Sequence, residues 1–315
     1  MEIIRDMRGT VADGVQTAIS IGAYDGIHLG HQSVISTLRD RAEANDLATA
    51  VITFDQHPAL VLRPENAPKL LTTLDQRLEL IEALGVDYVY LIEFTPERSK
   101  TSPEQFVEYV FVKALHARMV VVGENFHFGR GRAGDVAALE QLGEAHGFDV
   151  EGVPLLQSAT HSFEPVSSTG IRRALAGGHV AEAAAMLGRN YEVRGDVIHG
   201  DARGHAIGFP TANIPVDRKM AWPADGVYAG WFTCEGGDRH PCAINIGRRP
   251  TFHLHAEHSL LEAHLLDFEG DLYGQCGRVE FVQFLRSEQR FNGIDALAEQ
   301  LKKDVEHTRE VLARE

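Results

Sequence analysis

Hydrophobic and polar positions in the first half of the chain follow two alternating periods. Short apolar runs bounded by turn residues predict strands over residues 17–21, 47–54, 88–92 and 119–122. Apolar residues at helical spacing predict helices over 30–44, 74–84, 102 to about 115, and 135–146. Strands that alternate with helices indicate a parallel α/β sheet, in which ligands bind at the carboxyl ends of the strands.

The pattern changes after two short helices predicted over 168–178 and 180–187. Short β-type runs separated by Gly, Pro and Asp then follow, at 191–198, 227–233, 242–246, 260–266 and 278–285. Such a pattern is typical of an antiparallel barrel, and one helix over 294–312 closes the chain. We therefore expect an α/β Rossmann-like domain over 1–187 and an antiparallel β-barrel domain with a C-terminal helix over 188–315.

Length and charge agree with two domains that act on small molecules. The chain has 315 residues, more than one core usually holds. Lys and Arg number 30 and Asp and Glu 45, so the formal net charge is −15. An acidic surface argues against a nucleic-acid partner or an anionic membrane partner, and makes any basic or glycine-rich loop a candidate for anion binding.

Three cysteines without a Cys-x-x-Cys motif fit a reducing compartment. No stretch approaches 18 apolar residues, and the first residues lack the apolar core of a leader peptide. We expect a cytoplasmic protein; its oligomeric state, homo-oligomers included, stays open.

The segment 22–31 (GAYDGIHLGH) lies at a predicted strand-to-helix turn. Free backbone N–H groups and the positive end of the dipole favour a phosphate at a helix start, and Gly30 removes a side chain that would block its approach. Two surface histidines beside a turn are the alternative. The surrounding glycines favour an ATP site instead, with Gly22, Asp25 and Gly30 as binding residues and His28 and His31 as catalytic hydrogen-bond donors to the triphosphate.

A second glycine-rich segment, 199–213 (HGDARGHAIGFPTAN), lies in the β-rich half. A flexible loop with Gly200, Gly204 and Gly208 can wrap phosphates. Thr211 and Asn213 are two residues apart, so both face one side of an extended chain, and their oxygens suit Mg²⁺. The alternative is an ordinary glycine-rich turn between strands.

Aromatic residues follow two of the predicted parallel strands. Phe54 lies in the segment 53–58, and Phe126 and Phe128 lie in 122–129. Both segments start where a parallel sheet binds its ligand, and flat rings suit an isoalloxazine or adenine ring. The alternative for each ring is a place in the core.

Two of these segments resemble signatures of the α/β-phosphodiesterase nucleotidyltransferases. The His28–His31 segment resembles their HxGH motif, and Ser168-Thr-Gly-Ile-Arg172 resembles their second motif, also at a helix start. The resemblance implies that Ser168, Thr169 and Arg172 hold the β- and γ-phosphates of ATP. Taken alone, such a serine is most often a helix cap.

The whole chain resembles the bifunctional bacterial riboflavin kinase/FAD synthetase family. The matching runs include 22–31, 53–58, 123–129, 167–172, 208–213, 226–229, 245–251, 261–268 and 284–286, in the family's order. The resemblance implies that the C-terminal domain phosphorylates riboflavin with ATP to FMN, and that the N-terminal domain adenylylates FMN to FAD and pyrophosphate.

The resemblance also implies roles for single residues. Glu262 matches the family's general base for the ribityl hydroxyl, and Thr211 and Asn213 match its Mg²⁺ positions. The flavin-binding positions carried over are Phe54, His57, Pro58, Asn125, Phe126, Phe128 and Arg286. A relative with a single activity, a flavin sensor without turnover, and a nucleotidyltransferase for another substrate stay open as alternatives.

Overall fold

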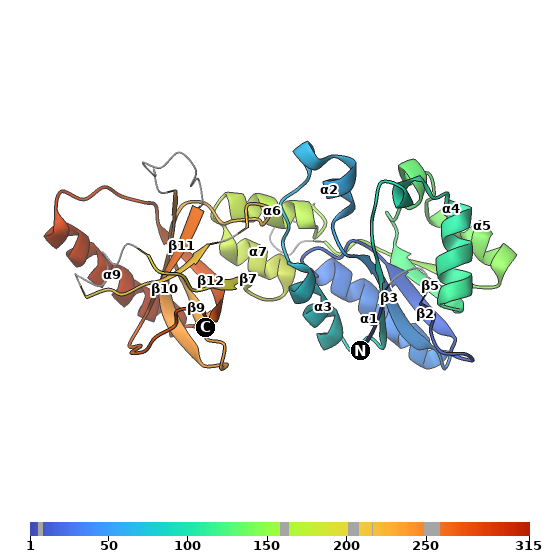
Figure 1. Cartoon of the computed structure of the whole chain (residues 1–315), viewed down its shortest axis with the longest axis horizontal. Helices are drawn as coiled ribbons and strands as arrows, with labels where there is room; N and C mark the ends of the chain where they lie inside the picture. Colours follow the sequence, from blue (N-terminus) through green and yellow to red (C-terminus); the bar gives the residue numbers. More distant parts are fainter. Residues whose placement is uncertain (6–8, 158–163, 201–207, 216, 249–258) are drawn as a thin grey trace. The chain divides into compact units, whose positions relative to one another are not determined.

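The computed structural model describes residues 1–5, 9–157, 164–200, 208–215, 217–248 and 259–315. The chain divides into two compact units, Met1–Ser168 and Thr169–Glu315 (Figure 1). Each unit is built around a six-stranded sheet.

The sheet of the first unit is entirely parallel. Its strands are β1 (Glu2–Arg5), β2 (Thr17–Ile21), β3 (Ala48–Phe54), β4 (Tyr88–Ile92), β5 (Ala117–Gly123) and β6 (Asp149–Val153). They lie in the order β1-β4-β3-β2-β5-β6. The four strands that the sequence predicts here are confirmed, whereas the edge strands β1 and β6 were missed because both are short and partly polar.

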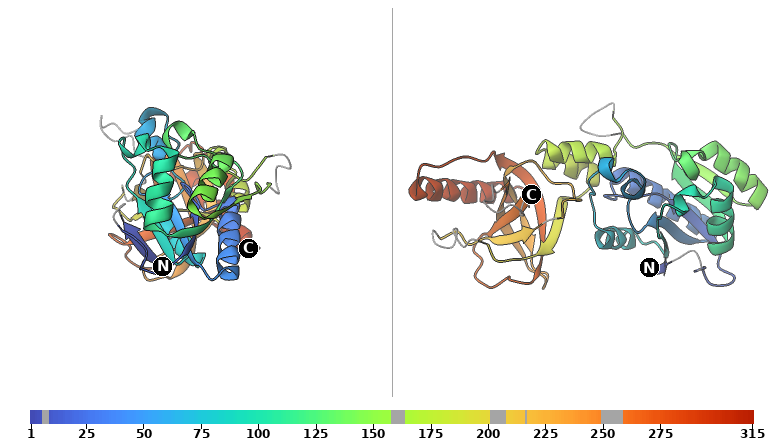
Figure 2. Two further views of the ribbon diagram at one scale, coloured as in Figure 1. Left: turned by 90° about the vertical axis from the view of Figure 1, so that its right-hand side faces the viewer. Right: turned by 45° about the horizontal axis from the view of Figure 1, so that its top comes forward.

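Helices cover both faces of this sheet because successive strand residues point to opposite sides. Ala18, Val51 and Val121 pack in one apolar cluster with residues of α1 (Leu29–Ala44) and α3 (Leu74–Ala83). Ile19, Ile52 and Val120 pack in the other, with the helical segment α4–η3 (Pro103–Phe106 and Val107–Ala114) and α5 (Val136–His146) (Figure 2). Ser102 forms a capping box at the start of α4, and Asp135 is the N-cap of α5.

The strand order places the predicted ligand segments together at the carboxyl edge of this sheet. Going along the chain, β3 and β4 lie on one side of β2, and β5 and β6 lie on the other. The order therefore reverses between β2 and β5, where open α/β sheets bind their ligands. The segment 22–31 follows β2, the segment 53–58 follows from β3, and Asn125 follows β5.

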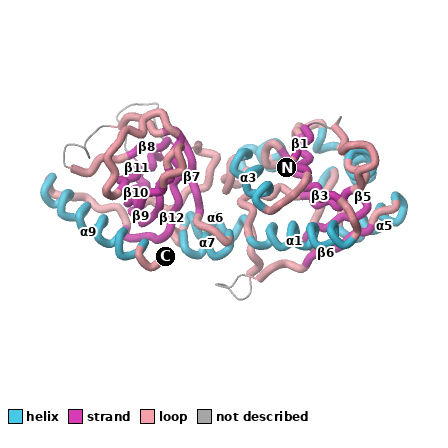
Figure 3. Tube along the Cα trace, turned by 90° about the horizontal axis from the view of Figure 1, so that it is seen from below, coloured by secondary structure: helices cyan, strands magenta, loops and turns pink. Residues whose placement is uncertain are grey.

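The second unit has a strongly bent antiparallel sheet. Its strands are β7 (Tyr191–Asp196), β8 (Ala212–Pro215), β9 (Gly226–Thr233), β10 (Arg239–Arg248), β11 (Ser259–Leu265) and β12 (Cys276–Arg286). The order is β7-β12-β9-β10-β11-β8 (Figure 3). A bridge between Ile198 and Asn213 joins the two outer strands, so the sheet nearly closes into the predicted barrel.

The described part of the second unit also contains the helices α6 (Ser168–Ala176), α7 (Val180–Leu187) and α9 (Ile294–Leu312). Ala229 and Trp231 on the outer face of β9 pack against Val311 and Leu312 of α9. α9 has the predicted bounds, because its apolar positions recur at helical spacing and match one face of the barrel.

Candidate functional site

The turn after β2 has an unusual backbone conformation. Tyr24 and Ile27, with φ of 51° and 38°, lie in the left-handed region beside Gly26 at 88°. Both side chains are buried, and the Tyr24 hydroxyl lies 2.6 Å from Ser20 Oγ. Tertiary packing therefore fixes a strained turn, a feature that often marks functional sites.

Asp25 anchors this turn from within the protein. Its buried carboxylate accepts hydrogen bonds from the Leu71 N–H at 2.9 and 3.1 Å and from the Thr72 N–H at 3.1 Å. The Gly26 N–H in turn donates to Thr72 Oγ1 at 3.2 Å. The Asp25 carboxylate is thus occupied by the N–H groups of Leu71 and Thr72, which precede α3. Asp25 would therefore contribute to ATP binding by fixing the backbone of the turn.

His28 and His31 lie against each other at the start of α1. Their rings stack with centroids 3.6 Å apart and an angle of 17° between planes. His28 is the N-cap of α1, and its Nδ1 accepts the His31 N–H at 3.3 Å. That hydrogen bond places the proton of the neutral His28 ring on Nε2, which is then a donor.

His31 has an unusual electrostatic environment. Its Nδ1 is buried and has no hydrogen-bond partner in the described part of the chain. Burial, with a smaller contribution from His28, holds the pKa of His31 well below its usual range. His31 is therefore uncharged at neutral pH. The two histidines can hydrogen-bond a phosphate that binds at the N-terminus of α1.

Gly30 has the tight surroundings expected of a residue in this turn. A Cβ at this position would lie 3.2 Å from Nδ1 and Cε1 of His28. Gly22, at the end of β2, has a similar constraint, since a Cβ there would lie 3.2 Å from the Tyr24 ring. Both glycines allow the turn to pack closely around the histidines.

The second nucleotidyltransferase motif meets this turn through its serine. Ser168 Oγ donates to the Asp25 carbonyl at 2.9 Å. Thr169 is exposed and Arg172 partly buried in the first turns of α6. The division of the chain assigns both to the second unit, so their phosphate contacts stay predictions.

The predicted flavin residues of the first unit lie after β3 and β5. Phe54 ends β3 and meets Phe94 edge to face at 5.3 Å. His57 is the N-cap of α2 (Pro58–Leu62), with its Nδ1 accepting the Ala59 N–H at 3.1 Å and Pro58 at the first helical position. Asn125 is exposed just beyond β5.

Phe126 and Phe128 differ in their surroundings. Their rings are stacked with centroids 5.5 Å apart and planes 7° apart. Phe128 is buried in the core under the sheet, whereas Phe126 is only partly buried against it. A direct flavin contact is therefore easier for Phe126, and Phe128 supports its ring from behind.

Strand register in the barrel brings together residues far apart in sequence. Glu262 on β11 lies opposite Asn213 on β8 and opposite Asn245 on β10. Directly opposite side chains have Cβ atoms about 4.5–5.5 Å apart, so the three polar groups form one row on the outer face of the sheet. Sequence reasoning missed Asn245 as a site residue, because only the register places it next to Glu262.

Asn213 has the features of an oxygen ligand. Its side chain is buried, Nδ2 donates to the Thr211 carbonyl at 3.2 Å, and Oδ1 is buried without a hydrogen-bond partner among the described residues. Gly200 packs on it, because a Cβ there would lie 2.5 Å from Nδ2. An orphaned oxygen beside Thr211 and Glu262 fits Mg²⁺, which takes few protein ligands when it also binds phosphates. No three His, Cys, Asp or Glu side chains in the described ranges converge as metal ligands.

The rest of the predicted kinase residues are placed in part. Gly208 has a φ of 85°, a conformation that suits glycine. Gly204 and the neighbouring His205 lie outside the described residues. Arg286 donates to the Asp304 carboxylate at 2.8 and 2.6 Å, so its guanidinium is bound to α9. A flavin contact, as predicted, would have to use the atoms of Arg286 that Asp304 does not bind.

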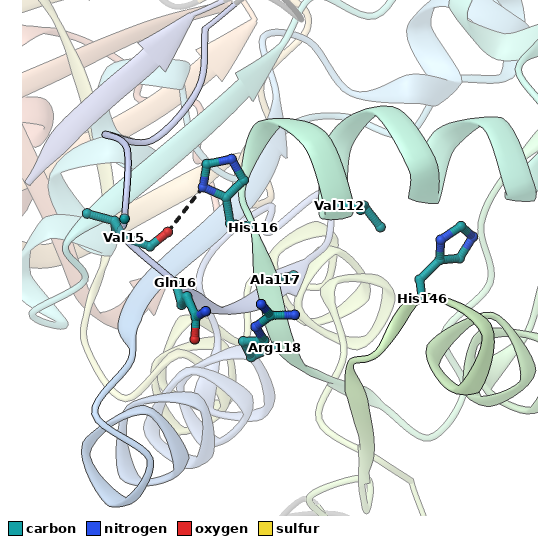
Figure 4. Close-up of a pocket in the computed structure, with 8 residues that line it drawn as sticks. Val15, Gln16, Val112, His116, Ala117, Arg118 and His146 are labelled. Atoms are coloured by element: carbon teal, nitrogen blue, oxygen red, sulfur yellow. Dashed lines mark hydrogen bonds between the residues drawn. The ribbon is translucent and has the colours of Figure 1, made fainter.

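A cavity of about 250 Å³ opens at the other edge of the parallel sheet (Figure 4). Its lining includes Gln16 before β2, His116 and Arg118 at the start of β5, and His146 at the end of α5. His116 Nδ1 lies 3.2 Å from the Val15 carbonyl. None of the predicted site residues lines this cavity, because they follow the carboxyl ends of the strands.

Comparisons with known proteins agree with this arrangement. Residues 11–170 match the FAD synthetase family, and residues 187–312 match the riboflavin kinase family. The bifunctional riboflavin kinase/FMN adenylyltransferase of Listeria monocytogenes is 38% identical over 301 residues, covering 95% of this chain and 94% of that protein. The protein of the same name from Escherichia coli is 36% identical over 297 residues, covering 94% and 91%.

The fold is also similar to that of a solved structure over nearly the full length. It is the crystal structure of a Streptococcus pneumoniae protein described as a macrolide-efflux protein, with a TM-score of 0.88 and 29% identity over 98% of this chain and 99% of that one. In the described part of the present chain, no helix is both long and apolar enough to cross a membrane.

Proposed function

This chain belongs to the family of bifunctional riboflavin kinases/FMN adenylyltransferases, and on that premise we propose that it makes FMN and then FAD at two separate sites. The observation that carries the proposal is that the two family matches fall on different sheets: 11–170 contains β2 to β6 of the parallel sheet, and 187–312 contains all strands of the barrel. The substrates are riboflavin, FMN and ATP.

The first unit transfers AMP. A phosphate oxygen of FMN attacks the α-phosphorus of ATP, the bond to the bridging oxygen breaks, and pyrophosphate leaves. His28 and His31, stacked at the N-terminus of α1, hydrogen-bond the triphosphate as charge develops on it. Gly22 and Gly30 give the phosphates room, Asp25 shapes the turn, and Ser168 lies beside it through its hydrogen bond to the Asp25 carbonyl.

The flavin of FMN lies against the segments that follow β3 and β5. Phe54 and Phe126 offer their ring faces to the isoalloxazine, with Phe128 behind Phe126. His57, Pro58 and Asn125 border the same edge of the sheet. FMN bound at these positions would lie at the reversal of strand order, next to the ATP turn.

The second unit transfers the γ-phosphoryl group. The ribityl hydroxyl of riboflavin attacks the γ-phosphorus, its proton passes to the Glu262 carboxylate, and ADP leaves. Mg²⁺ held by Thr211 and Asn213 would neutralise charge on the transferred phosphoryl group. The orphaned Asn213 Oδ1 and its position opposite Glu262 support this assignment. Gly200 and Gly208 contact the phosphates of ATP in this proposal, and Arg286 borders the flavin.

A cytoplasmic location follows from the proposed chemistry. Both reactions consume ATP, and all three cysteines, Cys234, Cys242 and Cys276, are unpaired, as in a reducing compartment.

A timed product analysis tests the proposal. The purified protein is incubated with riboflavin, ATP and Mg²⁺, and products are separated by chromatography. FMN followed by FAD is expected. FMN alone would refute the adenylyltransferase half, and flavin binding without any product would refute both halves and favour a sensor.

Reciprocal variants assign the sites. His28→Ala combined with His31→Ala should abolish FAD formation and leave FMN formation unchanged. Asn213→Ala should abolish FMN formation while FAD still forms from added FMN. If either change disabled both steps in a folded protein, the two-site proposal would be wrong.

A further inference from the structure

Arg77 on α3 is a buried cation at the carboxyl edge of the parallel sheet. It is 5% exposed, and it is not among the residues that the proposed chemistry uses. Its Nη1 donates to the Ala23 carbonyl at 2.8 Å, and its Nη2 donates to the Phe54 carbonyl. Its Nε is buried and has no partner in the described ranges.

The two carbonyls belong to the two ligand segments. Ala23 lies inside the turn 22–31 that carries the histidines, and Phe54 ends β3 within the segment 53–58 that carries His57 and Pro58. β2 and β3 are parallel neighbours with Ile21 opposite Ile52. One planar guanidinium therefore ties together the ends of two adjacent strands at the point where each leaves the sheet.

Each of the two ligand segments also contributes one carboxylate that interacts electrostatically with Arg77. Burial lowers the pKa of Arg77, and Asp25 of the first segment and Asp55 of the second offset part of this shift by favouring the charged form. Asp55 also fixes its own segment, because its Oδ1 accepts the N–H of Gln56 at 2.7 Å and of Phe94 at 3.0 Å. The cation is thus shared by both segments through the Ala23 and Phe54 carbonyls.

A buried charge is costly, and an apolar side chain of similar volume usually stabilises a fold as well or better. The buried guanidinium of Arg77 therefore needs a role other than packing. Arg, unlike Lys, has several donors in a fixed plane and can bind two separate carbonyls at a defined spacing.

We propose that Arg77 is a positioning residue for FMN adenylylation, which fixes the distance between the ATP-binding turn after β2 and the flavin-binding segment after β3. This inference rests on the proposed function of the first unit. Arg77 touches neither substrate; it acts through the Ala23 and Phe54 carbonyls. Small misplacement of reacting groups is enough to lower a rate about 100-fold.

The test compares Arg77→Met and Arg77→Lys with the wild-type full-length protein. Arg77→Met removes all donors at similar volume, and Arg77→Lys keeps the charge but not the two-pronged geometry. We expect kcat/KM for FMN adenylylation to fall about 10- to 100-fold in Arg77→Met, with a raised KM for FMN, and to recover in part in Arg77→Lys. Arg41→Met is the matched control, since Arg41 forms an exposed pair with Glu151 in the same unit.

Riboflavin kinase activity of the same preparations should stay within about two-fold, because the proposed kinase residues lie in the other unit. A merely structural role would lower the folded fraction and the apparent kcat but leave both KM values unchanged, and that result would overturn the proposal. If Arg77→Met does not fold, an unchanged KM for FMN in Arg77→Lys overturns it equally. Absence of FAD formation by the wild type would instead refute the proposed function.

Discussion

Replacing Asp25 should unfold the first unit more easily without touching the second. Asp25 is only 3% exposed, and its carboxylate binds the backbone N–H groups of Leu71 and Thr72, which are themselves buried. In Asp25→Ala both donors lose their acceptor in a place that water does not reach.

The size of the effect follows from these two donors. A buried donor left without a partner costs about 1–3 kcal/mol, so two cost about 2–6 kcal/mol. Asp25→Asn keeps one acceptor oxygen but loses the charge, and we expect a loss of about 1–2 kcal/mol. Domains are stable by about 5–15 kcal/mol in total, so Asp25→Ala leaves the first unit marginal.

The two tryptophans separate the two units in a urea titration. Trp222 and Trp231 both lie in Thr169–Glu315, so tryptophan fluorescence reports the second unit. Far-UV circular dichroism reports both. We expect Asp25→Ala to shift an early dichroism transition to lower urea concentration and to leave the fluorescence transition in place.

Asp75→Asn is the matched control. Asp75 is exposed in the first turn of α3, where its charge is worth less than about 1 kcal/mol. If Asp25→Ala moved the first transition no further than Asp75→Asn, Asp25 would not anchor the turn and the reasoning would fail.

Two further predictions concern charge. Because burial and His28 lower the pKa of His31, the unfolded chain takes up a proton near pH 6.5 that the folded unit resists. The stability that this histidine contributes is thus present above about pH 6.5 and falls as the pH drops below that value. In the wild type, the first unit should therefore be less stable at pH 5.5 than at pH 7.5. In His31→Gln this difference, measured by urea unfolding at the two pH values, should be smaller. In the second unit, Arg286→Met leaves the buried Asp304 carboxylate without its two-pronged partner, and should lower the fluorescence-monitored stability by about 3–5 kcal/mol. If His31→Gln and the wild type lost the same stability between pH 7.5 and 5.5, the prediction for His31 would be wrong. If Arg286→Met left the midpoint of the fluorescence transition unchanged, the prediction for Arg286 would be wrong.

Local patterns were enough to place most elements of this fold. The strands over 17–21 and 88–92 and the helix over 294–312 have the predicted bounds, because apolar periodicity and capping residues act over a few neighbouring positions. The order of strands and helices was likewise enough to predict a parallel sheet followed by a barrel. The edge strands β1 and β6 carry too few apolar residues to show this signal.

Single residues were harder, because their surroundings are not local. The sequence placed Asp25 in an ATP motif, but only the fold shows that Leu71 and Thr72 occupy its carboxylate. The sequence predicted the same flavin-binding role for Phe126 and Phe128, whereas in the structure Phe128 is buried and Phe126 is only partly buried.

The sequence by itself determined the element types and the motifs that carry the proposed chemistry. Tertiary structure alone decided which groups meet: His31 under His28, Asn245 beside Glu262, and Arg77 between the ends of β2 and β3. The physical reason is that periodicity and capping depend on neighbours along the chain, whereas register, burial and desolvation depend on segments that only folding brings together.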